Sequence, residues 1–211
     1  MSEQEPSLHN AYALKTPEDS IRLYADWAKS YDEQFAEASG YVLPEVTAKE
    51  FLSGGGRGPV LDVGAGTGLL GVLLNAAGVR VLDATDISQE MLEQASRKDV
   101  YRDTIQADLT VGVPVPADSY AGIVSSGTFT HGHVGPEVIP GMLRIARRDA
   151  LFALSINAAH YHAHGFAALF DDLQAQGQIK RFSRPEHRIY GPNNQGLNKD
   201  DTAFIAVFRK A

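Results

Sequence analysis

The chain contains no cysteine among its 211 residues. Disulfide bonds and thiolate metal ligands are therefore excluded, and the absence agrees with the cytoplasmic location that we expect. Positive charge is also scarce, because 19 lysine and arginine residues stand against 26 acidic residues and the formal net charge is −7. Since a chain of this charge is not attracted to a phosphate backbone at long range, we expect no nucleic-acid partner.

Long apolar runs are absent as well. No segment approaches the roughly 20 consecutive apolar residues of a membrane-spanning helix, and residues 1–6 lack the apolar core of a signal peptide. We therefore expect no membrane association. What remains is an ordinary globular composition, with 44 % hydrophobic and 21 % charged residues, in a chain as long as one domain.

The order of the segments predicts a single α/β domain. Residues 1–17 are expected to form a mobile arm, and residues 18–52 hold two helical segments that are expected to form an N-terminal lid. From residue 59 to 211, strands alternate with helices, which predicts a Rossmann-like, doubly wound and mostly parallel sheet. We expect seven strands, with the β-rich stretch 202–209 as an antiparallel strand at the sheet edge. The helices expected within this core are 69–77, 88–97, 138–147 and 162–176.

A glycine-rich segment follows the first predicted strand directly. Strand 59–63 runs into the glycines of residues 64–68, and a helix comes next. Glycine permits the sharp turn and lets a ligand approach the backbone, while the helix N-terminus offers free N–H groups. A nucleotide-type ligand is expected there, at the carboxyl ends of the strands. Acidic residues stand at three of these strands: Asp62 before the loop, and Asp86 and Asp108 after the second and third strands.

Two cofactors compete for this loop. Residues 66–71 formally supply the G-x-G-x-x-G pattern of a dinucleotide site, so NAD stays open as an alternative. Gly64 adds a glycine upstream, and Asp62 precedes the loop where a dinucleotide-binding strand normally has no acid. Both features favour S-adenosylmethionine (SAM), which has no phosphate. Asp86 can accept both ribose hydroxyls of either cofactor, whereas Asp83, inside the strand, is expected to be structural.

The same residues carry a resemblance to a known family. Residues 61–68, LDVGAGTG, resemble the first SAM motif of class I methyltransferases, and residues 86–92, DISQEML, resemble the segment after their second strand. More narrowly, residues 24–32 and 129–134 are similar to the Williams–Beuren syndrome region methyltransferase-like group. The resemblance covers residues 24–177 and implies a class I methyltransferase with SAM as its cofactor.

The resemblance also implies roles for individual residues. Asp86 would take the ribose, Asp108 would meet the adenine amino group, and Ser126 with Gly127 would lie beside the reacting methyl. Tyr31 would cover the cofactor from the N-terminal region. The full set of expected cofactor-binding residues is Tyr31, Asp62, Gly64, Ala65, Gly66, Gly68, Asp86, Ile87, Met91, Asp108, Leu109, Ser126 and Gly127.

Histidines supply the candidates for catalysis. Methyl transfer from a sulfonium is an in-line displacement in which positioning provides much of the rate, and a base is needed only when the nucleophile must lose a proton. His131 and His133 follow the fourth predicted strand, so each is a candidate base or substrate ligand; loop histidines that face water are the alternative. His160, His162 and His164 alternate, but no carboxylate stands at ligand spacing, so we expect a helix start or pocket wall and no metal.

The leading hypothesis is therefore a SAM-dependent methyltransferase that acts on a small molecule. The alternatives are a non-catalytic SAM-binding regulator and an NAD-dependent oxidoreductase. A nucleic-acid methyltransferase lacks support, because residues 126–129 do not form an Asn-Pro-Pro-Tyr-type motif. We expect residues 24–31 to close over the cofactor and residues 129–133 and 157–161 to form the opposite wall. The oligomeric state stays open.

Overall fold

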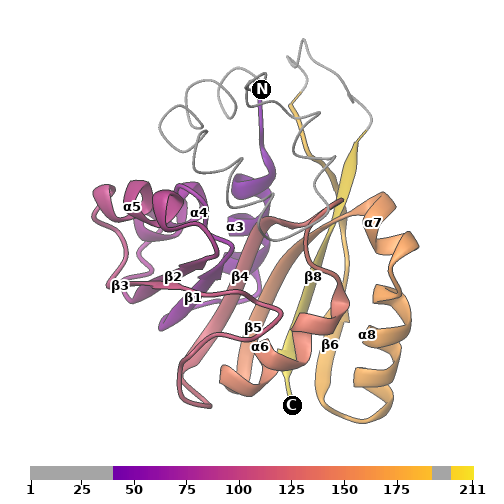
Figure 1. The fold of residues 1–211 in the computed structure, drawn as a ribbon. Helices are drawn as coiled ribbons and strands as arrows, with labels where there is room; N and C mark the ends of the chain where they lie inside the picture. The colour runs from indigo at the N-terminus through magenta and orange to yellow at the C-terminus, as the bar shows by residue number, and fades with distance from the viewer. Residues whose placement is uncertain (1–39, 192–200) are drawn as a thin grey trace.

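A computed structural model describes residues 40–191 and 201–211 (Figure 1). The expected arm at 1–17, Tyr31 and most of the expected lid lie outside the described residues. Only the last helix of the lid, predicted to end near residue 52, falls inside them, as α3.

The helices and strands alternate along the chain as predicted. The helices are α3 Leu43–Ser53, α4 Leu69–Ala76, α5 Gln89–Arg97, the short 3-10 helix η2 Pro136–Val138, α6 Ile139–Ile145, α7 Ala158–Ala163 and α8 Phe166–Ala175. The strands are β1 Val60–Val63, β2 Leu82–Asp86, β3 Asp103–Gln106, β4 Tyr120–Phe129, β5 Ala146–Asn157, β6 Ile179–Ser183, β7 Glu186–Arg188 and β8 Thr202–Lys210.

The eight strands form one sheet in the order β3-β2-β1-β4-β5-β8-β6, and β7 also pairs with β8. Strands β1 to β5 pair in parallel, whereas β8 runs antiparallel to β5. Both β6 and β7 pair with β8, with Ile179 opposite Lys210 and Glu186 opposite Phe204. The predicted Rossmann-like, mostly parallel fold is confirmed, with eight strands instead of the seven expected. Residues 202–209 are antiparallel as predicted, but they do not form the edge strand, because β6 and β7 pair with the side of β8 that faces away from β5.

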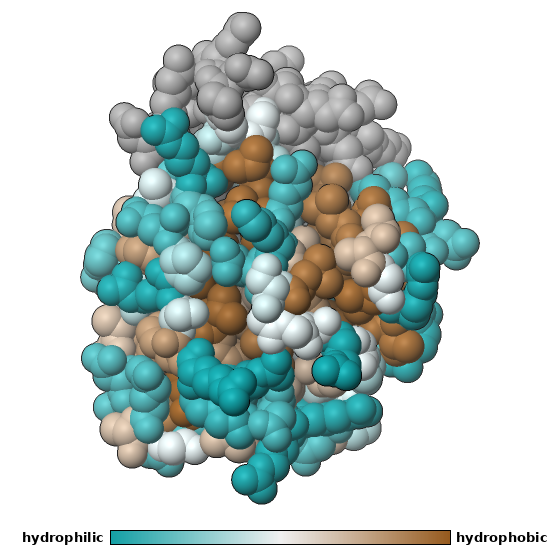
Figure 2. Space-filling view, turned by 180° about the vertical axis from the view of Figure 1, so that it is seen from behind, coloured by the Kyte–Doolittle hydropathy of each residue, from teal (hydrophilic) through white to brown (hydrophobic). Residues whose placement is uncertain are grey.

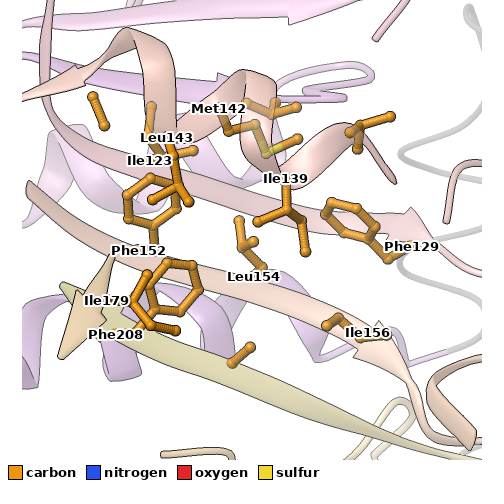
Figure 3. Packing of buried hydrophobic residues seen from close by; sticks show 14 of the residues in the cluster. Ile123, Phe129, Ile139, Met142, Leu143, Phe152, Leu154, Ile156, Ile179 and Phe208 are labelled. Atoms are coloured by element: carbon orange, nitrogen blue, oxygen red, sulfur yellow. The ribbon is translucent and has the colours of Figure 1, made fainter. Parts of the chain in front are cut away.

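Helices cover both faces of the sheet (Figure 1). On one face, α6, α7 and α8 enclose the larger apolar core, where Ile139 and Met142 lie over Ile123 and Leu154 (Figure 3). On the other face, α3 and α4 enclose a second core that contains the fully buried Phe51. Each face therefore buries its own apolar layer, as a doubly wound sheet requires.

Two predicted element boundaries were wrong. The helix expected at 162–176 is two helices, α7 and α8, because Gly165 between them has a φ of +76° and stops the first. The helix expected at 138–147 ends at Ile145, and Arg147 already belongs to β5. The first difference matters for function, because it places His160 on a separate short helix directly after β5.

The order of the strands positions a ligand site. The chain moves from β1 outward to β2 in one direction and from β4 outward to β5 in the other, so β1 and β4 form the topological switch point. Seen from behind, the molecule shows apolar residues gathered in the middle of the face between polar ones (Figure 2). Within residues 40–191 and 201–211, no helix has both the length and the apolar character to cross a bilayer.

Candidate cofactor and acceptor site

The glycine-rich loop lies at the switch point and is held by the end of β2. The N–H groups of Gly64 and Ala65 both donate to the Thr85 carbonyl, at 2.8 and 3.0 Å. Gly64 has a φ of +65°, in the left-handed region that glycine adopts without strain. The loop therefore has one defined course before any ligand arrives.

The end of β4 closes the loop from the other side. Thr128 Oγ1 donates to the Val63 carbonyl at 3.0 Å. A Cβ built on Gly64 would collide with the Thr128 side chain, so the glycine is required by close approach as well as by its φ. Sequence reasoning did not find Thr128, because the contact joins residues 64 positions apart. At Gly66, in contrast, a built Cβ meets no atom within 4 Å, so the loop is open there.

Asp86 faces this loop from the end of β2. Its Oδ2 accepts the Gly66 N–H at 2.8 Å, and its Oδ1 accepts the Ser88 N–H at 2.9 Å. Burial raises the pKa of Asp86, while these hydrogen bonds oppose the shift. Each carboxylate oxygen has two lone-pair sites, so Asp86 can still accept two ribose hydroxyls. Asp83 instead binds Arg102 Nε at 2.9 Å and the Tyr120 hydroxyl at 2.9 Å, which is the structural role expected for it.

Three buried polar atoms at the carboxyl ends of adjacent strands have no hydrogen-bond partner among the described residues. They are Asp62 Oδ1 on β1, Thr85 Oγ1 on β2 and Ser126 Oγ on β4. Buried polar groups without partners are rare in folded proteins and call for a ligand or another partner. Their position around an open glycine loop fits a polar cofactor that carries hydrogen-bond donors.

The residues expected on the adenine side differ in their exposure and in their hydrogen bonds. Ser88 caps α5 by accepting the Met91 N–H at 3.2 Å, and the Met91 side chain is buried. Asp108 Oδ1 accepts the N–H of Thr110 at 2.8 Å. Ile87 and Leu109 are half-buried, and Leu109 packs against the larger core.

An additional aromatic residue approaches the end of β4. A Cβ built on Gly127 would lie 2.6 Å from the Tyr41 hydroxyl. Tyr41 forms an antiparallel bridge with Tyr190, and the Gly127 N–H donates to Ser155 Oγ at 2.9 Å. Tyr41 belongs to no sequence motif, so no local pattern points to its position beside Gly127.

Four histidines gather at the carboxyl ends of β4 and β5. The ring centroids of His131 and His160 are 5.9 Å apart, and those of His160 and His164 are 4.3 Å apart. His160 Nε2 donates to the Val134 carbonyl at 3.0 Å, and His133 Nδ1 donates to the His131 carbonyl at 3.0 Å. The structure thus brings the two predicted histidines close to His160, which lies within the range 157–161 that was expected to form a wall of the pocket.

Burial governs the protonation of this cluster. It lowers the pKa of His133, against the effect of the hydrogen bond to the His131 carbonyl. It also lowers the pKa of His160, with repulsion from His164 and His131 in the same direction. For His133 and His160, the neutral imidazole is therefore favoured at neutral pH, and a neutral imidazole can accept a proton.

His162 differs from its neighbours, because its ring contacts Phe204 at a centroid distance of 5.7 Å. The three alternating histidines therefore do not share one face. Across the part of the chain that the structure describes, no three histidine, aspartate or glutamate side chains come together in a way that could hold a metal ion.

Comparisons with known proteins agree with this geometry. Residues 60–150 match the family described as "Methyltransferase domain". The human methyltransferase-like protein 27 is 28 % identical over 151 residues, which cover 69 % of this chain and 60 % of that protein. The chain thus spans 60 % of the length of this curated relative.

Solved structures share the fold. A SAM-dependent methyltransferase from Thermotoga maritima has a TM-score of 0.63 at 12 % identity, over 90 % of this chain and 98 % of that chain. The cyclase SpnF has a TM-score of 0.66 at 14 % identity, over 93 % of this chain and 97 % of that chain. At these identities, the likeness concerns the fold alone.

Proposed function

We propose that the chain transfers a methyl group from SAM to a small-molecule acceptor, a proposal that the match of residues 60–150 to the methyltransferase domain supports. The observation that carries the proposal is the open loop at Gly66, which lies beside Asp86 and near three buried polar atoms without partners. This arrangement stands at the switch point where open α/β sheets bind their ligands.

The proposal assigns the holding of the cofactor to residues around the loop. Asp86 would accept the ribose hydroxyls, and Asp108 with Leu109 would meet the adenine. Gly64 and Gly66 would admit the methionyl part of SAM. The other residues of the loop and of the strand ends that were predicted from the sequence would also contact the cofactor. When bound, SAM supplies an electrophilic methyl group, so the chain has to orient the acceptor and exclude water.

His131 and His133 are proposed for the acceptor side. They follow β4, whose end also carries Ser126 and Gly127, the residues proposed to lie beside the methyl group. Either histidine can take a proton from an acceptor whose nucleophile must lose one. Tyr41, which approaches Gly127, joins them as a proposed wall of the acceptor site.

A small molecule is the acceptor that the composition favours. The net charge of −7 disfavours a nucleic acid. Membership of the narrower Williams–Beuren syndrome region methyltransferase-like group belongs to the same proposal, and the 28 % identity to human methyltransferase-like protein 27 supports it. A cytoplasmic location is likewise proposed from the sequence.

A non-catalytic SAM-binding protein is the second candidate, because a fold does not by itself determine function. Calorimetry with SAM, its demethylated product S-adenosylhomocysteine and NAD tests the cofactor first. We expect binding of the first two and none of NAD. Production of S-adenosylhomocysteine with a panel of small oxygen, nitrogen and sulfur nucleophiles then tests transfer. SAM binding without turnover of any acceptor supports the second candidate, and NAD binding without SAM binding contradicts both.

A further inference from the structure

The tyrosine that precedes β3 fills a space below the glycine loop. A Cβ built on Gly68 would lie 2.9 Å from Tyr101 Cε2. A Cβ built on Gly71, inside α4, would collide with the Tyr101 hydroxyl and ring. Gly71 therefore lacks a side chain because the tyrosine ring occupies that space. The last glycine of the G-x-G-x-x-G pattern thus has a steric role that requires no dinucleotide.

The Tyr101 hydroxyl acts both as a hydrogen-bond donor and as an acceptor. It donates to Asp62 Oδ2 at 2.7 Å, and it accepts a backbone hydrogen bond from Gly71. Helix α4 starts at the N-cap Gly68 without a side-chain cap. Its first N–H groups have no partners within the helix, so the tyrosine satisfies one of them from outside. A single hydroxyl thereby connects the start of α4 to the carboxylate on β1.

This connection leaves the two oxygens of Asp62 in different situations. Oδ2 is held by Tyr101, whereas Oδ1 is buried and has no hydrogen-bond partner among the described residues. Asp62 is fully buried and stands two residues before Gly64. Burial raises the pKa of Asp62 to about 7, the bond from Tyr101 opposes the shift, and the nearby Asp86 adds to it. A donor that reaches Oδ1 would favour the ionised carboxylate.

We propose that Tyr101 is a positioning residue of the cofactor site, which acts through Asp62 on the methionyl end of the ligand. By holding Oδ2 and the start of α4 together, it keeps Oδ1 in one orientation beside the loop. Gly71 is the position that admits it. The inference rests on the proposed SAM site but adds a residue outside the loop and outside every motif named from the sequence.

A pair of ligands separates positioning from general support of the fold. S-adenosylhomocysteine carries the amino-acid end, whereas 5′-methylthioadenosine has the same adenosine and thioether without it. Calorimetry with the Tyr101→Phe variant should show about tenfold weaker binding of S-adenosylhomocysteine, a fraction of what one hydrogen bond to a charged group contributes. Binding of 5′-methylthioadenosine should stay within about twofold, because this ligand never reaches Asp62.

Tyr120→Phe is the matched control. Tyr120 lies at the start of β4, away from the loop, and its hydroxyl also donates to a buried carboxylate, that of Asp83, at 2.9 Å. The variant removes this hydrogen bond. This variant should weaken neither ligand, although its thermal stability should fall. Asp62→Asn supplies a second measurement, should Tyr101→Phe fail to fold, and we expect the same loss confined to S-adenosylhomocysteine.

The outcomes distinguish the inference from the proposed function. Equal weakening of both ligands in Tyr101→Phe, or no weakening of either, overturns the positioning role while the SAM site stands. Absence of S-adenosylhomocysteine binding in the unmodified protein overturns the proposed function itself. A loss confined to the ligand with the amino-acid end supports the inference.

Discussion

The two sides of the sheet's carboxyl edge are built in different ways. Around β1 and β2, backbone groups define the site, because Asp86 accepts two backbone N–H groups and the loop amides donate to the Thr85 carbonyl. Around β4 and β5, side chains from separate segments define it, because His131 meets His160 from α7 and Tyr41 approaches Gly127.

This difference indicates which part of the site has its geometry fixed before a ligand binds. A backbone-built cradle has little freedom, which suits a cofactor that is the same in every turnover. A wall of side chains from distant segments can change with few substitutions, which suits an acceptor that differs between related proteins. Variants on one side should therefore change cofactor affinity alone, and variants on the other should change turnover alone.

Gly64→Val should have the largest effect. The φ of +65° is unfavourable for a β-branched residue, and any Cβ there collides with Thr128. The loop has to leave its course, so SAM affinity measured by calorimetry should fall by more than about a hundredfold.

Gly78→Val is the control for backbone strain. Gly78 has a φ of +94°, but a Cβ built on it meets no atom within 4 Å. The control should lose stability and keep SAM affinity. If Gly64→Val retained normal SAM affinity, the loop would be able to move freely, which would contradict the view that the backbone-built cofactor side has little freedom.

Asp86→Ala should come next. It removes the acceptor proposed for both ribose hydroxyls and also releases the Gly66 N–H. A hydrogen bond to a charged group contributes about 1.5–3 kcal/mol, so SAM affinity should fall by roughly ten- to a hundredfold. Asp103→Ala is the control, because it removes the same charge from an exposed position on β3. If the two variants bind SAM equally well, Asp86 does not hold the ribose.

The cofactor side could be predicted from the sequence because its information is local. The alternation of strands and helices, the loop at 64–68 and the position of Asp86 follow from neighbouring residues. Propensity and periodicity act over such short distances. The fold and the frame of the cofactor site were therefore predictable before any coordinates.

The remaining parts depend on contacts between distant residues. Thr128 reaches Gly64 across the sheet, and the Tyr101 hydroxyl reaches Asp62 over 39 positions. Tyr41 reaches its place through the bridge with Tyr190. No local pattern encodes such pairs, because each depends on how the elements pack. Tyr41 was missed for this reason, whereas His131 and His133 could be named because they follow the fourth predicted strand directly.

Asp62→Asn should change the pH dependence of stability rather than the fold. The folded protein holds this carboxyl with a pKa of about 7, above its usual 3.8. The folded state thus binds more protons than the unfolded state between these values, so stability falls as pH rises from about 4 to about 7. At 1.36 kcal/mol per unit, this group contributes about 4 kcal/mol at low pH that is lost by neutral pH.

Chemical denaturation of the apo-protein at several pH values measures this contribution. Asp86 contributes with the same sign, because burial raises its pKa as well, so the difference between the unmodified protein and Asp62→Asn gives the contribution of Asp62 together with its coupling to Asp86. The variant should show a flatter profile between pH 4 and 7 and a similar one above. Identical profiles would mean that Asp62 is ionised in the folded protein at lower pH.

His131→Gln and His133→Gln should have the smallest effect on SAM affinity and so test the other side of the comparison. The His133 ring donates to the His131 carbonyl, and burial lowers its pKa, so the neutral form that accepts protons is favoured at pH 7. His131 and His133 follow β4 and lie with His160, whereas the end of β2 holds the glycine loop, so calorimetry should give SAM affinities within about twofold of the unmodified protein. Turnover with an acceptor that must lose a proton should fall by about a hundredfold for the histidine that acts as base.

His162→Gln is the matched control, because this ring turns toward Phe204 instead of the cluster. It should leave both quantities unchanged. Should the two cluster variants weaken SAM binding as strongly as Asp86→Ala, the edge of the sheet would be one coupled site, and the division between a backbone-built cofactor side and a side-chain-built acceptor side would not hold.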